Sequence, residues 1–106
     1  MEIILHVHHA NISMSMRQRA ERAVRKLADR LKRTVDAVIR FEEDGAERRV
    51  ELELRAPKRR PLVAEGRGKF FGGAFSQAIA RLEREVRAEH DKNVSSRRAL
   101  RKAAAA

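Results

Sequence analysis

Residues 13–33 read SMSMRQRAERAVRKLADRLKR, and two regular spacings run through this stretch. Apolar residues at helical spacing form one stripe of Met16, Ala20, Val24, Leu27 and Leu31. Basic residues at the same spacing, with no acid among them, form a second row of Arg19, Arg22, Lys26, Arg30 and Arg33. At about 100° per residue, the two rows lie roughly a third of a turn apart. The stretch therefore predicts one long helix that buries the stripe and presents the cations outward.

The composition narrows the class of protein. The chain has 106 residues, which is enough for one domain with a modest core. Lysine and arginine number 25 against 15 acidic residues, so the formal charge is +10, and arginine predominates. Arginine bonds phosphate in pairs and stacks on bases, so nucleic acid is the first expected partner. A membrane is not expected as a partner, because the basic row lacks the flanking Trp, Phe and Leu that enter lipid.

Several other classes of protein are excluded on composition. The chain has no cysteine, so neither a disulfide framework nor a thiolate metal site is available. The first residues enter a β-like run with no leader pattern, and no apolar stretch approaches membrane-spanning length. We therefore expect a cytoplasmic protein that is a monomer when free and needs no cofactor or small-molecule substrate.

Alternation of apolar and polar residues predicts four strands. They span residues 1–9, 35–43, 49–56 and 62–65. In the third strand valine and leucine alternate with arginine and glutamate, so one side of the sheet faces water, as in an antiparallel sheet with one covered face. Asp44 and Gly45 predict a hairpin turn between the second and third strands.

A second amphipathic helix is expected at residues 74–92, after a glycine-rich break at residues 66–73. Ser13 is the expected N-cap of the first helix. The order β-α-β-β-β-α predicts an α+β domain over residues 1–92, in which two helices pack on one face of a four-stranded sheet. The first strand joins the second through a right-handed crossover if the two are parallel. Residues 93–106 form a basic, alanine-rich tail whose helical state is left open.

The basic row of the first helix is the strongest candidate site. A solvated helix face normally mixes both signs, whereas here Glu21 and Asp29 lie on the opposite flank with Arg25 and Lys32. In the second helix, the arginines at 81, 84 and 87 alternate with glutamates, and this pattern is also typical of plain pairs such as Arg81–Glu85 and Glu83–Arg87. The proline-bounded basic loop at residues 58–60 is a third candidate for phosphate contact.

Catalytic and metal sites find little support. The glycine stretch is no Walker A loop, because Lys69 is followed by Phe70. It remains a possible anion site at the amides after Gly73. The histidines at 6, 8, 9 and 90 lack a third ligand nearby and are expected to be surface residues. No nucleophile lies beside a base, so the protein is not expected to be an enzyme.

The few aromatic residues limit how RNA could be bound. None of the four phenylalanines falls in the first or third strand, so the sheet offers no platform for stacked bases. The phenylalanines are Phe41, Phe70, Phe71 and Phe75. What remains is a module that contacts RNA backbone through cationic helices.

Two stretches resemble the short ribosome hibernation-promoting factors, also called ribosome-associated inhibitors or protein Y. The first is Asn11-Ile12-Ser13 followed by a helix with Arg17, Lys26-Leu27 and Arg33. The second is Ala64-Glu65-Gly66 before a helix with Arg81-Leu82-x-Arg84-x-Val86 and Asp91-Lys92. The resemblance covers roughly residues 1–92 and has the same order of elements.

The resemblance implies binding in the messenger and transfer RNA channel of the small ribosomal subunit, which blocks translation while ribosomes are idle under stress or in stationary phase. It implies ribosomal RNA contacts at Arg17, Lys26, Arg33, Arg81 and Arg84. With the basic row and the loop, the full predicted RNA-binding set is Arg17, Arg19, Arg22, Lys26, Arg30, Arg33, Lys58, Arg59, Arg60, Arg81, Arg84 and Arg87. The alternative is a basic adaptor that binds free structured RNA or an acidic protein.

Overall fold

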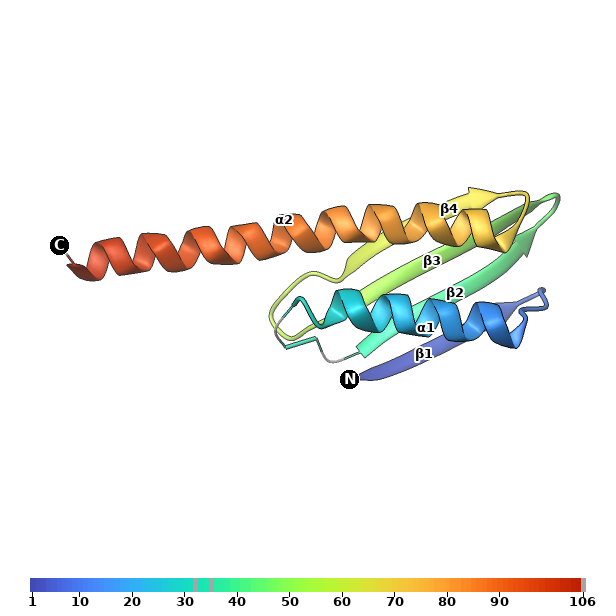
Figure 1. The fold of residues 1–106 in the computed structure, drawn as a ribbon, viewed down its shortest axis with the longest axis horizontal. Helices are drawn as coiled ribbons and strands as arrows, with labels where there is room; N and C mark the ends of the chain where they lie inside the picture. The colour runs from blue at the N-terminus through green and yellow to red at the C-terminus, as the bar shows by residue number, and fades with distance from the viewer. Residues whose placement is uncertain (32, 35, 106) are drawn as a thin grey trace.

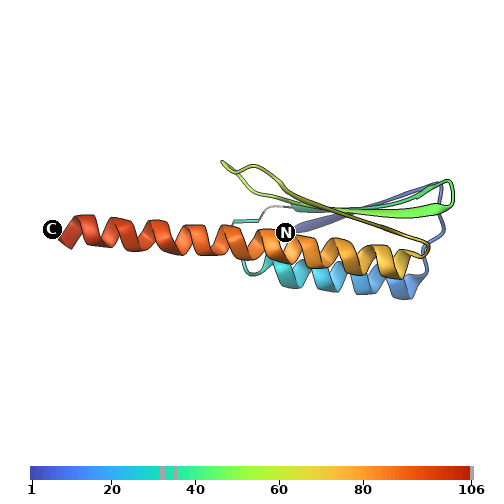
Figure 2. The same cartoon turned by 90° about the horizontal axis from the view of Figure 1, so that it is seen from above.

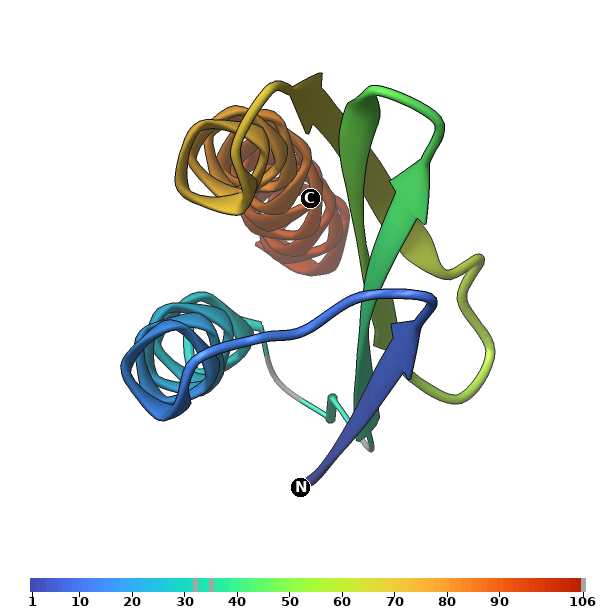
Figure 3. The ribbon, with the colours of Figure 1, turned by 90° about the vertical axis from the view of Figure 1, so that its right-hand side faces the viewer.

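The computed structural model describes residues 1–31, 33–34 and 36–105, with the main chain alone for residues 93–97 and 102–105. Its elements are β1 (Glu2–His8), α1 (Met14–Ala28), β2 (Asp36–Asp44), β3 (Glu47–Arg55), β4 (Leu62–Gly68) and α2 (Phe71–Ala105). The β-α-β-β-β-α order is therefore the predicted one (Figure 1). Both helices lie on the same side of the sheet, as the end-on view shows (Figure 3).

The four strands form one mixed sheet in the order β1-β2-β3-β4. β2, β3 and β4 are antiparallel neighbours, as predicted, but β1 pairs with β2 in parallel. The parallel pairing left open for the first two strands is the one present, because α1 carries the chain back to the end of the sheet where β1 began. The hairpin between β2 and β3 is present, with Gly45 and Ala46 as its loop and a φ of 63° at Gly45.

α1 begins where the sequence predicts and ends earlier. The hydroxyl of Ser13 accepts a hydrogen bond of 3.1 Å from the Met16 N–H, so Ser13 is the N-cap. After Ala28 the N–H groups of Arg30 and Leu31 donate to carbonyls three residues back, which tightens the chain into a turn. The turn still buries Leu31, so the apolar stripe is complete although the α-helix is not.

The connection after this turn reverses the chain towards β2. Arg33 has a φ of 69°, which no α-helix accommodates, and this explains why the predicted helix to residue 33 is too long. Two predicted positions, Lys32 in the helix and Val35 in the second strand, lie outside the described residues.

The core lies between the sheet and the two helices (Figure 2). The sheet contributes Ala37, Ile39, Phe41, Val50, Leu52 and Leu54, all fully buried. The helices contribute Ala20, Val24, Leu27, Ala74, Phe75, Ala78, Leu82 and Val86. Each large apolar side chain buried in this way contributes about 1.5–3 kcal/mol to folding. The apolar stripes of both helices were thus predicted correctly, and they fix which sides of α1 and α2 remain exposed.

The glycine-rich stretch is only partly a break between elements. Gly66 and Gly68 belong to β4, which is longer than predicted, and α2 begins at Phe71 instead of Ala74. A Cβ atom on Gly66 would lie 1.9 Å from the Ala74 carbonyl oxygen and 2.7 Å from the Ala78 nitrogen. Gly66 therefore lets the main chain of α2 rest directly on β4, which no other residue allows.

α2 also continues beyond the expected end near Lys92. Its last turns extend past the sheet to Ala105, so the predicted tail forms the far end of the helix (Figures 1 and 2). The side chains described in this part, residues 98–101, are exposed, and they include Arg98, Leu100 and Arg101.

Candidate nucleic-acid interface

The face of the sheet turned away from the helices carries a network of ion pairs. Strand register brings together Arg40, Arg49, Arg55 and Arg67 with Asp36, Glu42, Glu47, Glu51, Glu53 and Glu65. Arg49 alone contacts three carboxylates, at 2.7 Å from Glu51, 3.0 Å from Glu42 and 3.3 Å from Glu65. Because four arginines share six carboxylates, this face repels phosphate.

The ion pairs of this face change the pKa of one of its carboxyl groups. The hydrogen bond from Arg67 lowers the pKa of Glu65, more than burial raises it, and Arg49 adds to the lowering. None of the four phenylalanines lies on this face. Phe41 and Phe75 are buried in the core, Phe71 packs edge-on against Phe41 at 5.6 Å, and Phe70 is exposed at the start of α2. The open sheet face therefore offers RNA no phenylalanine to stack on, and its four arginines are already paired with carboxylates.

The outward side of α1, in contrast, is positively charged. Arg17, Arg22, Arg25 and Lys26 are exposed and form no ion pair with any side chain that the structure describes. Arg22 donates from Nε to the Gln18 carbonyl of its own helix at 3.4 Å, which leaves its other donors outward. Arg25 is not in the predicted RNA-binding set, but its exposed position three residues after Arg22 makes it a further candidate.

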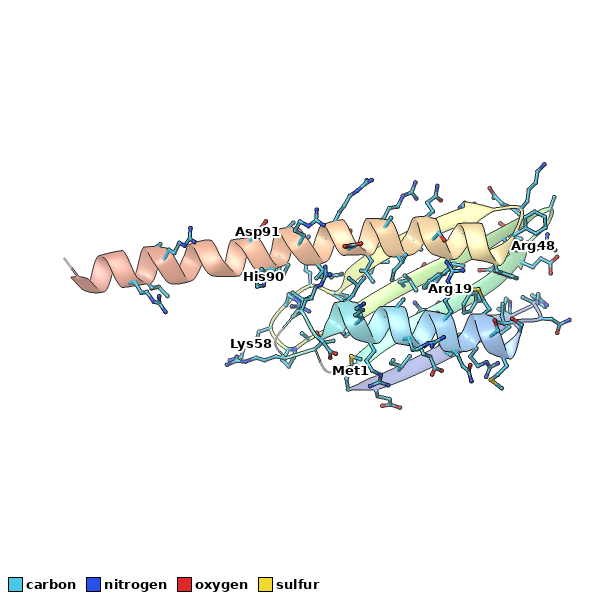
Figure 4. The ribbon with its side chains drawn as sticks, viewed as in Figure 1. Met1, Arg19, Arg48, Lys58, His90 and Asp91 are labelled. Carbon is cyan, nitrogen blue, oxygen red and sulfur yellow. The ribbon has the colours of Figure 1, made fainter. Side chains whose placement is uncertain are left out.

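Arg19 lies between the two helices (Figure 4). Its Nη2 donates to the Ser76 hydroxyl at 3.1 Å, and its guanidinium carbon is 5.4 Å from the centroid of the Phe75 ring. A cation over an aromatic face is stabilised by the ring quadrupole. Arg19 therefore links α1 to α2.

Arg30 and Arg87 also meet between the helices. The Nη1 atom of Arg30 is 3.5 Å from Glu83 Oε1, and the Nη2 atom of Arg87 is 3.7 Å from the same oxygen. The plain Glu83–Arg87 helix pair considered from the sequence is thus present. Arg84, by contrast, is exposed and has no ion-pair partner among the described side chains.

Arg81 is partly engaged with the sheet. Its Nη1 donates at 2.7 Å to the main-chain carbonyl of Glu65 in β4. Glu85, its expected helix partner, instead contacts the main chain of Val63, and burial raises the pKa of Glu85 despite that hydrogen bond. The alternative pairing of Arg81 with Glu85 is therefore wrong.

The basic loop at residues 58–60 does not join the helical cations. The loop between β3 and β4 bends away from the helices, on the far side of the sheet (Figures 2 and 3). Lys58 has a φ of 59°, and two guanidinium nitrogens of Arg59 are buried with no hydrogen-bond partner in the described part of the chain. Arg33 is exposed in the connection before β2.

In the described part of the chain, the structure supports neither a metal site nor the anion position considered from the sequence. Among the described residues, no group of three or more His, Cys, Asp or Glu side chains could hold a metal ion. The possible anion site at the amides after Gly73 finds no support at Ala74, whose N–H already donates to the Phe70 carbonyl at 3.1 Å. Within the same described ranges, no helix combines the length and apolar character needed to cross a membrane.

The model of the family described as Sigma 54 modulation protein / S30EA ribosomal protein matches residues 3–94. The chain belongs to this family. Sigma 54 modulation/S30EA proteins are ribosome-associated and not enzymes, which confirms the resemblance seen in the sequence and the expectation of a non-catalytic protein.

Two solved structures share the fold of this family member. A ribosomal subunit interface protein from Coxiella burnetii has a TM-score of 0.73 and 15% identity, over 84% of this chain and 97% of that one. The N-terminal domain of Thermus thermophilus Protein Y has a TM-score of 0.68 and 21% identity, over 81% and 96%. None of the curated proteins compared with the chain matches it.

Proposed function

We propose that this protein inhibits translation by lodging in the messenger and transfer RNA channel of the small ribosomal subunit. The helical side faces ribosomal RNA and the sheet faces away from it. Ribosome association is the property of the family, and it implies that the protein acts in the cytoplasm. The proposed setting is the idle ribosome under stress or in stationary phase.

The separation of charge between the two faces supports this orientation. Exposed cations that pair with no described carboxylate cover the outward side of α1 and continue on α2 at Arg84. On the opposite face, each arginine is shared between carboxylates, as at Arg40, which lies 2.8 Å from Glu51 and 3.4 Å from Glu53. A polyanion therefore gains more from contact with the helical side than with the ion-paired face of the sheet.

The proposed mechanism is steric. A domain whose cations neutralise phosphates of the channel occupies the path of messenger and transfer RNA without any chemical step. Each phosphate that the protein neutralises releases condensed counterions, so the logarithm of the binding constant falls by roughly 0.7–0.9 per phosphate for each logarithmic unit of salt. Contact by four or more cations predicts binding that falls steeply between low and physiological salt.

Charge reversal on each side tests the orientation. Arg22, Arg25 and Lys26 are changed together to Glu, and binding to purified small subunits is measured by co-sedimentation. The matched control reverses residues 58–60 to Glu, which alters the net charge equally on the far side. We expect the helix variant to lose binding and the loop variant to keep it while both remain folded. Equal loss from both variants would contradict the orientation.

A second experiment, on lysates of stationary-phase cells, separates the channel inhibitor from the adaptor alternative. Gradient fractionation of stationary-phase cells should place the protein with small subunits. A protein that stays free of ribosomes under all conditions, and binds structured RNA or an acidic protein instead, would favour the adaptor.

A further inference from the structure

A small notch lies where α2 begins to extend past the sheet. It is lined by Arg30, in the turn after α1, and by Val86, Arg87 and His90 of α2. Its volume is about 210 Å³, below the range of pockets that enclose drug-sized molecules. His90 lies on the side of α2 that faces the end of α1 (Figure 4). The notch therefore suits a single ring system and not a folded ligand.

The notch combines an apolar floor with a charged rim. Val86 is 1% exposed and belongs to the core, so the floor is apolar. The rim carries Arg30 and Arg87, whose guanidinium groups both approach one oxygen of Glu83, at 3.5 and 3.7 Å. Glu83 cancels one of the two charges and holds both planar groups at the mouth. Imidazole and guanidinium planes are the groups on which unpaired bases stack in RNA complexes.

We propose that the notch receives one unpaired nucleobase of the bound RNA. The base stacks on His90 above Val86, and Arg30 and Arg87 meet the phosphates on either side of that nucleotide. The inference rests on the proposed RNA-binding function and adds a base-dependent contact to it. A free phosphate is a poorer occupant, because the apolar floor donates no hydrogen bond and Glu83 repels an anion.

Two synthetic strands of equal charge test the proposal at low salt. One is a five-nucleotide strand in which only the central nucleotide carries a base, adenine, and the other is the same strand without any base. We expect the adenine strand to bind about five- to tenfold more tightly, which is the low end of the stacking contribution per base. In NMR spectra, the Val86 methyl and His90 ring signals should shift with the adenine strand alone.

Two variants assign the preference to the notch. His90→Ala should bring the affinity for the adenine strand down to that for the bare strand, with the latter unchanged. Arg84→Ala, on the same helix but outside the notch, should weaken both strands alike and keep their ratio. Equal binding of both strands, or a preference that survives in His90→Ala, would overturn the notch and leave the cationic surface standing. Failure of both strands to bind would overturn the notch together with the proposed RNA binding.

Discussion

Arg81 of α2 donates a hydrogen bond of 2.7 Å to the main-chain carbonyl of Glu65 in β4. Two neighbours one helical turn away make similar contacts with alternate residues of the same strand. The three side chains are Gln77, Arg81 and Glu85, and their main-chain partners belong to Arg67, Glu65 and Val63. An unpaired strand edge invites association with other chains. Here side chains of α2 contact main-chain groups at the free edge of β4, which in a larger sheet would pair with a further strand.

Arg81 and Arg84 of α2 are expected to have different roles, Arg81 in the stability of the fold and Arg84 in binding. Arg81→Ala should lower the free energy of unfolding by about 1 kcal/mol, because a hydrogen bond to an exposed strand edge is lost. Arg84→Ala should leave stability within about 0.5 kcal/mol and weaken binding to small subunits. Urea denaturation and co-sedimentation of both variants measure the two effects. An Arg81→Ala variant as stable as the wild type would show that the edge contact contributes nothing.

Gly66 and Gly73 should respond in opposite ways to alanine. In Gly66→Ala the new methyl group overlaps the main chain at Ala74, so we expect a loss of about 3 kcal/mol or more, the upper range for overpacking. Nothing lies within 4 Å of a Cβ atom on Gly73, in the first turn of α2. Gly73→Ala should therefore be neutral or stabilising by up to about 1 kcal/mol. Thermal unfolding compares the two, and a neutral Gly66→Ala variant would refute the direct contact.

Arg19 and Ser76 should be energetically coupled across the two helices. Arg19→Ala removes both the hydrogen bond to Ser76 and the contact with the Phe75 ring, whereas Ser76→Ala removes the hydrogen bond alone. In a double-mutant cycle we expect a coupling free energy of about 0.5 kcal/mol for this exposed pair. Arg17 provides the control, because it is exposed without an ion pair to any described side chain. Additive effects of Arg19→Ala and Ser76→Ala would mean that the hydrogen bond does not join the helices in solution.

Acid should weaken the fold through Glu65. The Arg67 hydrogen bond, opposed by burial and aided by Arg49, places the pKa of Glu65 below 4.5 in the folded protein. A carboxyl with a lowered pKa stabilises the fold above its unfolded value and loses that contribution as the pH falls through the folded value. Glu65→Gln should therefore be less stable than the wild type above pH 4.5, and the difference should shrink in more acidic solution. A difference that stays constant between pH 7 and pH 3 would contradict the shifted pKa.

The features predicted from sequence are those that depend on near neighbours in the chain. Ser13 caps α1 through a residue three positions away, and Leu31 is buried because it continues a helical spacing. The exposure of Lys26 follows from the same spacing. Local patterns of this kind determine the element order, the apolar stripes and most of the outward cations.

The features that escaped prediction depend on contacts between distant parts of the chain. Gly66 was read as part of a break because nothing near it in sequence reveals the helix that rests on it. Helical spacing offered Glu85 as an alternative partner for Arg81, whereas Arg81 contacts the main chain of β4. The separation of residues 58–60 from the helices likewise depends on how the β3–β4 loop bends, which the alternation of side chains does not encode.

Gly66 also determines how closely α2 lies to the sheet. α2 sits on β4 through main-chain contact at Ala74 and Ala78, so flexible side chains do not set its height above the sheet. α1 rests on the same sheet and is tied to α2 by Arg19 and Arg30. The distance between the cations of α1 and Arg84 of α2 therefore depends in part on the absence of a methyl group at Gly66. If the protein binds RNA as proposed, we expect an RNA whose phosphates match that spacing to contact the cations of α1 and Arg84 of α2 together, and an RNA with a different groove width to contact one helix alone.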